Sequence, residues 1–197
     1  CAAGGSRRTT AGPRPPVALT DPSVGPHAVE VRDEDWLDAT RDRSIPVRLF
    51  LPTGMARAPL VVFSHGLGGS RNGYSHFGRY WASHGIATVH PQHAGSDRAV
   101  WSAGGGLALL GSLRSAATPE NAIARALDVR HALDRLLETR EWSGRFDAAR
   151  VGVAGHSFGA NTALLAAGAR YREDDGRTRT FGDPRVRAAV VMSAPSL

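Results

Sequence analysis

The chain has 197 residues, 42% of them hydrophobic and 21% charged, which suits one globular domain with a sizeable core. No apolar run reaches the ~18–20 residues of a membrane-spanning helix, so the sequence predicts none. The formal net charge of +6 comes from arginines mixed with acids, as in Arg41-Asp42-Arg43, which favours a solvated surface over nucleic-acid binding.

The N-terminal stretch, residues 1–26, is rich in Gly, Pro, Arg, Thr and Ala. This composition predicts a flexible tether ahead of a domain over residues 27–197. Cys1 is the only cysteine, which excludes an internal disulfide. The start Cys-Ala-Ala-Gly-Gly-Ser resembles the mature N-terminus of a bacterial lipoprotein. That resemblance implies a lipid on Cys1 and an exported protein, membrane-anchored or else secreted. An arbitrary start point and a free thiol are the alternatives.

Three strands are predicted next along the chain. Residues 28–31 alternate weakly and residues 45–51 alternate better, so we expect an antiparallel pair that ends at Pro52-Thr53-Gly54. The continuous apolar run at residues 60–63 is typical of a strand buried on both faces of a sheet.

The middle of the chain predicts a helix, a strand and a loop. Residues 74–84 carry aromatic side chains at helical spacing, which indicates a helix packed on the core and ended by Gly85. Residues 86–89 predict a strand, and the Gly- and Ser-rich stretch 94–117 predicts a long loop or lid.

In the last third of the chain, predicted helices and strands alternate again. Thr118-Pro119-Glu120 predicts a helix start, with a helix to about residue 139. The remaining expected elements are a buried strand at 150–154, a helix at 161–170, a polar loop at 171–183 and a strand at 186–192. Strands that alternate with helices predict an α/β fold, with a mainly parallel, doubly wound sheet.

The pattern Gly155-His156-Ser157-Phe158-Gly159 stands between the strand at 150–154 and the helix that follows it. In that context G-x-S-x-G indicates a nucleophile elbow, a sharp turn that projects the serine hydroxyl into a site. The glycines allow the neighbouring backbone to approach closely. We therefore expect Ser157 to be a catalytic nucleophile.

A second Gly-rich turn, Gly66-Leu67-Gly68-Gly69, leaves the strand at 60–63. Acyl transfer places negative charge on the carbonyl oxygen, and preorganised N–H donors must meet it. In an elbow architecture one donor is the residue after the nucleophile, here Phe158, and the other comes from the loop after an earlier strand. We expect Leu67 to be that second donor.

These motifs resemble the α/β-hydrolase superfamily, in particular its platelet-activating-factor acetylhydrolase and dienelactone-hydrolase-like lipoprotein branch. The matching stretches are residues 61–71, 81–85 and 150–160, and the resemblance covers about residues 25–197. It implies a serine esterase, because dienelactone hydrolases have Cys where this chain has Ser157. We expect no metal, because His90 and His93 have no clear third ligand, and no cofactor, because Gly66-Leu67-Gly68-Gly69 lacks the Lys-Ser/Thr of a phosphate-binding loop.

The sequence departs from the family pattern in the residue that would act as the general base. In this fold the acid and the histidine follow the serine, yet no histidine follows Ser157. We expect the chain to be truncated after the sixth strand of eight, so that the triad acid and histidine lie beyond residue 197. The rival is an upstream base such as His65, His90 or His93.

Two functions follow. The first is a hydrolase that cleaves small-molecule or lipid carboxylic esters through an acyl-enzyme on Ser157, with no nucleic-acid partner. The alternative is a non-catalytic, hydrolase-like anchored binding protein that lacks the triad acid and histidine. The sequence past residue 197 would discriminate between them.

Overall fold

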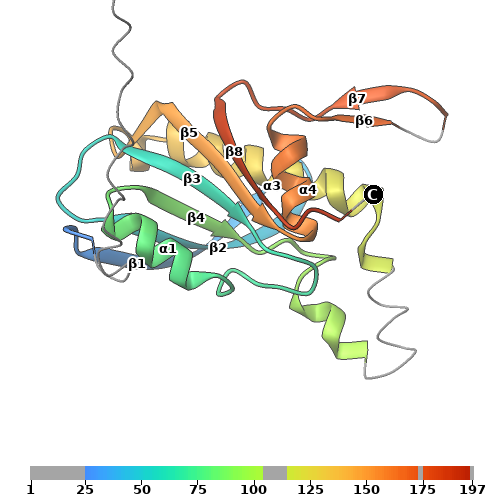
Figure 1. The fold of residues 1–197 in the computed structure, drawn as a ribbon, viewed down its shortest axis with the longest axis horizontal. Helices are drawn as coiled ribbons and strands as arrows, with labels where there is room; N and C mark the ends of the chain where they lie inside the picture. Colours follow the sequence, from blue (N-terminus) through green and yellow to red (C-terminus); the bar gives the residue numbers. More distant parts are fainter. Residues whose placement is uncertain (1–24, 104–114, 173–174, 196–197) are drawn as a thin grey trace, which may run out of the picture.

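We describe a computed structural model of the chain, which covers residues 25–103, 115–172 and 175–195. The expected tether at residues 1–26 lies outside this description except for its last two residues, and so does Cys1. Within the described part, the chain forms a central twisted sheet with helices on both faces and a separate two-stranded hairpin (Figure 1). The expected α/β architecture is therefore confirmed.

The central sheet has six strands in the order β1-β2-β4-β3-β5-β8. Their bounds are β1 Val29–Asp38, β2 Arg43–Pro52, β3 Ala58–Ser64, β4 Ala87–Pro91, β5 Phe146–His156 and β8 Val186–Met192. β1 and β2 form the expected antiparallel pair, and β2 also runs antiparallel to β4. The other four strands are parallel to one another. Each crossover between parallel strands contains a helix, as parallel pairing requires.

Several elements are longer or earlier than the sequence indicated. β1 continues to Asp38 because its partner β2 offers a ladder along its whole length. β5 begins at Phe146, where it pairs with Ala58 at the start of β3. The predicted helix at 161–170 instead runs from Phe158 to Ala166, directly from the elbow.

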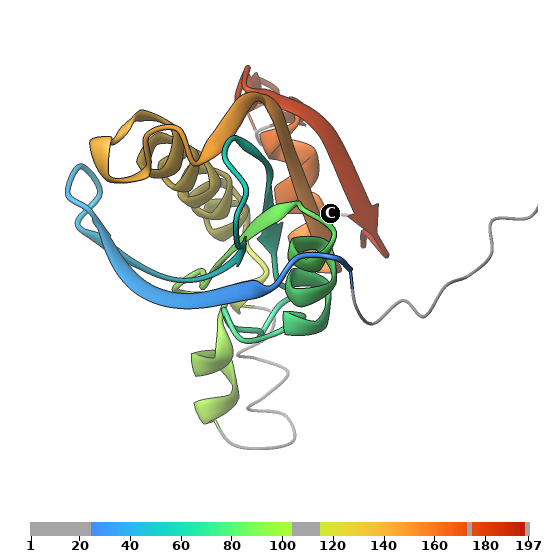
Figure 2. The same cartoon turned by 90° about the vertical axis from the view of Figure 1, so that its left-hand side faces the viewer.

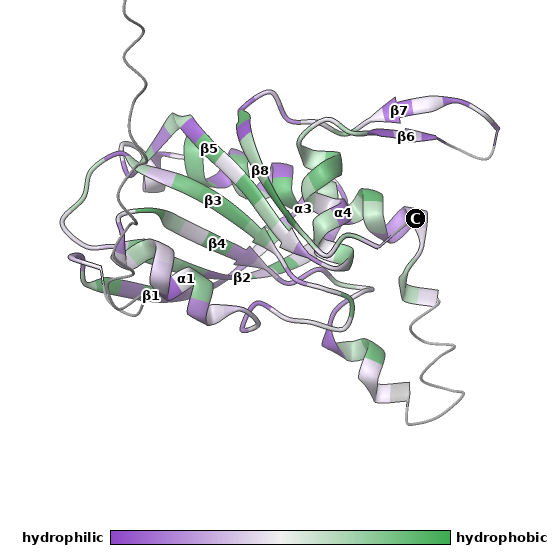
Figure 3. Ribbon diagram, in the orientation of Figure 1, coloured by the Kyte–Doolittle hydropathy of each residue, from purple (hydrophilic) through white to green (hydrophobic). Residues whose placement is uncertain are grey.

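The helices cover the two faces of the sheet, as Figure 2 shows for α1 (Ser75–Ser83) and α3 (Pro119–Glu138). α1 packs on β2 and β4, whereas α3 packs on β3, β4 and β5, and α4 (Phe158–Ala166) packs beside it on β5 and β8. The strands between them are apolar on both faces, and Figure 3 shows this as green bands along β3 and β5. The core therefore fixes where the two central parallel strands end.

The start of α3 is the capped start that the sequence predicts. The side-chain oxygen of Thr118 accepts a hydrogen bond from the backbone N–H of Asn121 at 3.2 Å, and Pro119 occupies the first helical position. The apolar stripe of α3 is buried in the core at Ala126, Val129, Leu133 and Leu136. This helix is therefore held by its cap and by packing together.

Two expected loops contain regular structure. The polar stretch 171–183 was expected to lack strands, but β6 (Arg170–Arg172) and β7 (Thr178–Thr180) form an antiparallel hairpin there (Figure 1). The stretch 94–117 contains the 3₁₀ helix η1 (Arg98–Ala103), and its residues 104–114 lie outside the described part. None of the helices in the described ranges is both long and apolar enough to cross a bilayer.

Candidate active site

Ser157 sits at the turn that links β5 to α4. Its backbone has φ 55° and ψ −124°, a left-handed conformation that non-glycine residues rarely adopt. The strand hydrogen bonds continue up to this residue, because its N–H donates to the carbonyl oxygen of Met192 on β8 at 2.9 Å. The helix begins at the next residue, Phe158. The predicted turn between strand and helix is therefore present, with Ser157 at its positive-φ position.

The two glycines of the motif are required by close backbone contacts. A Cβ atom on Gly155 would collide with the carbonyl group of Gly159. A Cβ atom on Gly159 would collide with the carbonyl oxygen of Ser64 at the end of β3. The first turn of α4 is thus pressed against the loop that leaves β3.

The elbow and the Gly-rich loop meet at one edge of the sheet. β3 and β5 are parallel neighbours, and Ser64 pairs in register with Gly155, so both strands end together. In open α/β sheets, ligands bind at this carboxyl edge of the strands. Gly66 follows the end of β3, and a Cβ atom there would lie 3.4 Å from the Cβ of Ser157.

The backbone donors expected for an oxyanion hole have no hydrogen-bond acceptor among the described residues. Among the described residues, the N–H of Leu67 donates no hydrogen bond. Phe158 is the first residue of α4, and the first N–H groups of a helix have no intrahelical acceptor. The positive end of the helix dipole adds to the attraction for an anion there.

One cavity of about 870 Å³ contains all three predicted site residues, Ser157, Leu67 and Phe158. The rest of its lining is mostly apolar and comes from the start of α3, from α4, from β6 and from single residues beside these elements and after β8. These residues are Ala117, Pro119, Ala122, Asn161, Leu164, Leu165, Ala169, Arg170, Tyr171, Arg172 and Pro195. The cavity size is that of a small-molecule site.

The hydroxyl of Ser157 has no hydrogen-bond partner among the described residues. The adjacent His156 points elsewhere, because its Nδ1 lies 2.7 Å from the hydroxyl of Tyr74. Of the acids after Ser157, Glu173 and Asp174 lie outside the described part. Asp183 binds the side chain and the N–H of Arg185 and is a turn residue.

His65 supports its own loop rather than the serine. Its Nδ1–H donates to the carbonyl oxygen of Gly66 at 2.7 Å, and its Nε2 accepts the backbone N–H of His93 at 3.2 Å. Both ring nitrogens are thus occupied. Burial, together with the nearby Arg125, holds the pKa of His65 well below its usual range. It is a neutral structural residue.

His90 lies on the opposite side of the sheet from the cavity, stacked on Phe63 with ring centroids 5.0 Å apart. Burial lowers the pKa of His90 to about 3. Neither His65 nor His90 lines the cavity, so the described structure does not bring these two upstream candidates to Ser157.

The third upstream candidate, His93, forms a Ser-His-Asp chain with a different serine. Its Nε2 lies 3.0 Å from Oγ of Ser64, and its Nδ1 lies 2.9 Å from Oδ2 of Asp128. Since an ionised carboxylate only accepts, Nδ1–H donates to Asp128 and Nε2 accepts the Ser64 hydroxyl. Burial lowers the pKa of His93 to about 4, so the ring is neutral.

The hydrogen bonds of Ser64, His93 and Asp128 have the distances of a catalytic triad, but these side chains are not accessible from the cavity. Ser64 is 1% exposed, His93 and Asp128 are 0% exposed, and none of them lines the cavity. The Ser64 oxygen also accepts a hydrogen bond from Nη2 of Arg125, which withdraws electron density from it. Ser64, His93 and Asp128 therefore form a buried structural chain behind the site.

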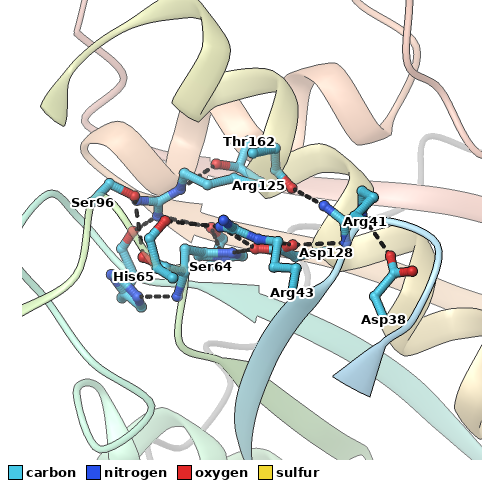
Figure 4. Close-up of polar contacts among 12 residues, drawn as sticks. Asp38, Arg41, Arg43, Ser64, His65, Ser96, Arg125, Asp128 and Thr162 are labelled. Atoms are coloured by element: carbon cyan, nitrogen blue, oxygen red, sulfur yellow. Dashed lines mark hydrogen bonds and ion pairs between the residues drawn. The ribbon is translucent and has the colours of Figure 1, made fainter. Parts of the chain in front are cut away.

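Arg125 and Asp128 of α3 are the residues that sequence analysis missed here, and Figure 4 shows them at the centre of a polar cluster. Burial lowers the pKa of Arg125 to about 9, still high enough to keep it charged near neutral pH. Burial would raise the pKa of Asp128, but hydrogen bonds from His93 and Arg43 hold it below its usual range. One signal was available: a charged pair three residues apart beside the apolar stripe.

The described residues contain no group of three or more His, Cys, Asp or Glu side chains that could hold a metal ion. The cavity presents the hydroxyl of Ser157, a mostly apolar wall and the polar side chains of Asn161, Arg170, Tyr171 and Arg172.

Comparisons with known proteins give the fold. The family model for platelet-activating factor acetylhydrolase, isoform II, matches residues 47–103, from β2 through the Gly-rich loop to η1. No curated protein sequence matches the chain significantly.

Three solved structures share the architecture. They are a 2,6-dihydroxy-pseudo-oxynicotine hydrolase (TM-score 0.53, 16% identity), a ferulic acid esterase from Streptomyces cinnamoneus (0.50, 22%) and a cold-adapted esterase from an Arctic intertidal metagenomic library (0.53, 20%). The matches cover 79%, 76% and 82% of this chain. The chain spans 34%, 56% and 59% of their lengths. The fold is that of the α/β hydrolases, as the sequence resemblance implied.

Proposed function

We propose that this α/β-hydrolase chain carries the nucleophile and the oxyanion hole of a serine esterase. The observation that supports this most is the shared cavity: Ser157, Leu67 and Phe158 come from two segments and line one apolar space. The left-handed backbone at Ser157 adds to it, because strained backbone conformations cluster at functional sites.

In the proposed reaction, Oγ of Ser157 attacks the carbonyl carbon of an ester and a base takes the hydroxyl proton. The carbonyl electrons move onto oxygen, where the N–H groups of Leu67 and Phe158 bind the charge. Collapse of the intermediate breaks the bond to the alkoxide, which leaves with the proton. Water then releases the acid from Ser157. The proposal requires a general base from outside the described residues.

The cavity lining suits an ester with an apolar acyl or alcohol group, whether a small molecule or a lipid. Leu164, Leu165 and Ala122 supply apolar surface beside the serine. Burial of such a group contributes roughly 25 cal/mol per Å² of apolar area.

A fluorophosphonate probe tests the proposal on the native full-length protein, because the probe reacts with activated serine nucleophiles. We expect labelling of Ser157, loss of labelling in Ser157→Ala and unchanged labelling in Ser102→Ala, an exposed serine on η1. Folded native protein that stays unlabelled would contradict the proposal.

A second candidate is a non-catalytic binding protein with the hydrolase fold. It is favoured by one observation: no described histidine is hydrogen-bonded to Ser157. Under this alternative, esters bind in the cavity with equal affinity in the wild type and in Ser157→Ala, and are not cleaved. Turnover of an ester such as p-nitrophenyl butyrate by the native protein would exclude it.

We also propose, from the sequence alone, that Cys1 is lipidated in an exported protein and anchors it to a membrane surface. Mass spectrometry of the native N-terminus tests this. A diacylglyceryl adduct on Cys1 is the expected result, and an unmodified thiol would contradict it.

A further inference from the structure

We infer that Arg125 is the positioning residue of the oxyanion hole: it fixes the loop that carries Leu67 against the helix that carries Phe158. This inference rests on the proposed function, since it assigns the two N–H donors to one hole. The donors belong to segments far apart in sequence, and their separation must be held to a fraction of an ångström for the hole to work.

The guanidinium of Arg125 reaches both segments at once. Its Nε donates to Oγ1 of Thr162 on α4 at 3.0 Å. Its Nη2 donates to Oγ of Ser64 at 3.1 Å and also to the carbonyl oxygen of His65, at the root of the Gly-rich loop. Figure 4 shows these contacts on both sides of Arg125.

A third segment is tied in through Ser96. Nη1 of Arg125 donates to the Ser96 hydroxyl at 3.1 Å, and the Ser96 carbonyl accepts the N–H of Gly68 at 3.0 Å. Gly68 is the neighbour of Leu67. The loop is thus held at His65 on one side of Leu67 and at Gly68 on the other.

The elbow side is held by a ring contact. The guanidinium carbon of Arg125 lies 4.8 Å from the ring centroid of Phe158. A cation over an aromatic face in a dry interior is attracted to it. Phe158 is half of the proposed hole, so Arg125 contacts one donor residue directly and flanks the other.

The buried, hydrogen-bonded series of Ser64, His93 and Asp128 orients Arg125 in turn. Ser64 donates to His93, so its oxygen is free to accept from Arg125, and His93 donates to Asp128. Asp128 also accepts from Nε of Arg43 at 2.8 Å. Each of the three guanidinium nitrogens of Arg125 has an acceptor, and Asp128 supplies the negative charge that a 0% exposed arginine needs.

A lysine could not replace this arginine. The guanidinium presents five donors in a planar fork and uses them on four acceptors in three directions, whereas an ammonium is a compact point charge. The Arg125→Lys variant keeps the positive charge, but its ammonium group cannot contact all four acceptors at once. It therefore separates positioning from simple charge compensation.

The test uses native full-length protein, p-nitrophenyl butyrate as substrate and a trifluoromethyl ketone as the oxyanion mimic. For Arg125→Lys we expect kcat to fall about 100-fold and KM to change less than about 3-fold, the pattern of a misplaced transition-state contact. The inhibition constant of the ketone should rise in parallel with the loss of kcat. Arg135→Lys, at a half-buried position on the same helix that pairs with Glu141 and does not line the cavity, is the matched control and should match the wild type.

A second variant covers the case in which Arg125→Lys does not fold. Thr162→Val keeps the side-chain shape and removes the hydroxyl, which accepts from Nε of Arg125 at 3.0 Å and also donates to the carbonyl oxygen of Phe158 at 3.4 Å. We expect kcat to fall about 5-fold at constant KM. Wild-type kcat in either folded variant would overturn the inference. An inactive, unlabelled wild type would instead overturn the proposed function, and this inference with it.

Discussion

The carbonyl oxygen of Ser64 occupies the space that a side chain on Gly159 would need. The end of β3 and the first turn of α4 are therefore in direct backbone contact, with no side chain between them. Because Leu67 follows Ser64 by three residues and Phe158 precedes Gly159, this contact sets how closely the two proposed oxyanion donors approach.

Gly159→Ala tests this contact. The added methyl group would push α4 away from β3, so we expect a loss of about 1–3 kcal/mol in the free energy of unfolding, as for other overpacked sites. Urea unfolding measures it. Gly152→Ala on β5 is the matched control, because its Cβ would make only ordinary contacts, at 3.5 Å from Val61. Equal stability of the two variants would contradict the account.

Removal of the nucleophile should eliminate turnover without unfolding the protein. Ser157→Ala takes away a hydroxyl that has no described hydrogen-bond partner, so we expect its stability to stay within about 0.5 kcal/mol of the wild type. Its ester hydrolysis should fall by about 10⁴-fold or more. Residual activity within tenfold of wild type would show that another group attacks the ester.

Asp128→Asn tests the buried charge that supports Arg125. The amide cannot compensate Arg125 and Arg43, so we expect a loss of about 3–5 kcal/mol, the cost of breaking a buried pair. Chemical unfolding of both proteins measures it. Asp33→Asn, which breaks the more exposed pair with Arg48, should cost less than about 1 kcal/mol. The reverse order of the two losses would contradict the assignment.

Stability should fall on mild acidification. Burial lowers the pKa of His93 to about 4 and that of His90 to about 3, both from 6.5. Below pH 6.5 the unfolded chain binds protons that the folded chain does not bind, so the free energy of unfolding decreases as pH falls toward 4. Each such histidine contributes a slope of up to about 1.4 kcal/mol per pH unit. Urea unfolding at pH 7, 6 and 5 measures the slope, and a flat profile would contradict it.

The elbow was predictable from sequence because its residues stand within five positions of one another and leave a pattern that can be read directly. Only part of its steric need is local: Gly155 is required by the carbonyl group of Gly159, whereas Gly159 is required by the carbonyl oxygen of Ser64 on β3. The sheet was predictable for a similar reason, since continuous apolar runs such as residues 60–63 mark strands covered on both faces.

Other features depend on contacts that no local pattern encodes. β6 (Arg-Tyr-Arg) and β7 (Thr-Arg-Thr) have three residues each, which is too short for a period-2 apolar signal. Arg125 finds its acceptors 29 to 61 residues away, on segments that only the folded sheet brings together. The hydrogen-bonded series of Ser64, His93 and Asp128 could not be predicted from the sequence for the same reason.

The measurement that tests the central claim most directly is the location of the acyl group after reaction with a slow ester. Trypsin releases Ser157 within residues 151–170, where it is the only serine, and Ser64 within residues 58–71. The account predicts a mass increase of one acyl group on Ser157 in the first peptide and none on the second. Acylation of Ser64, or turnover with residues 151–170 unmodified throughout, would contradict it.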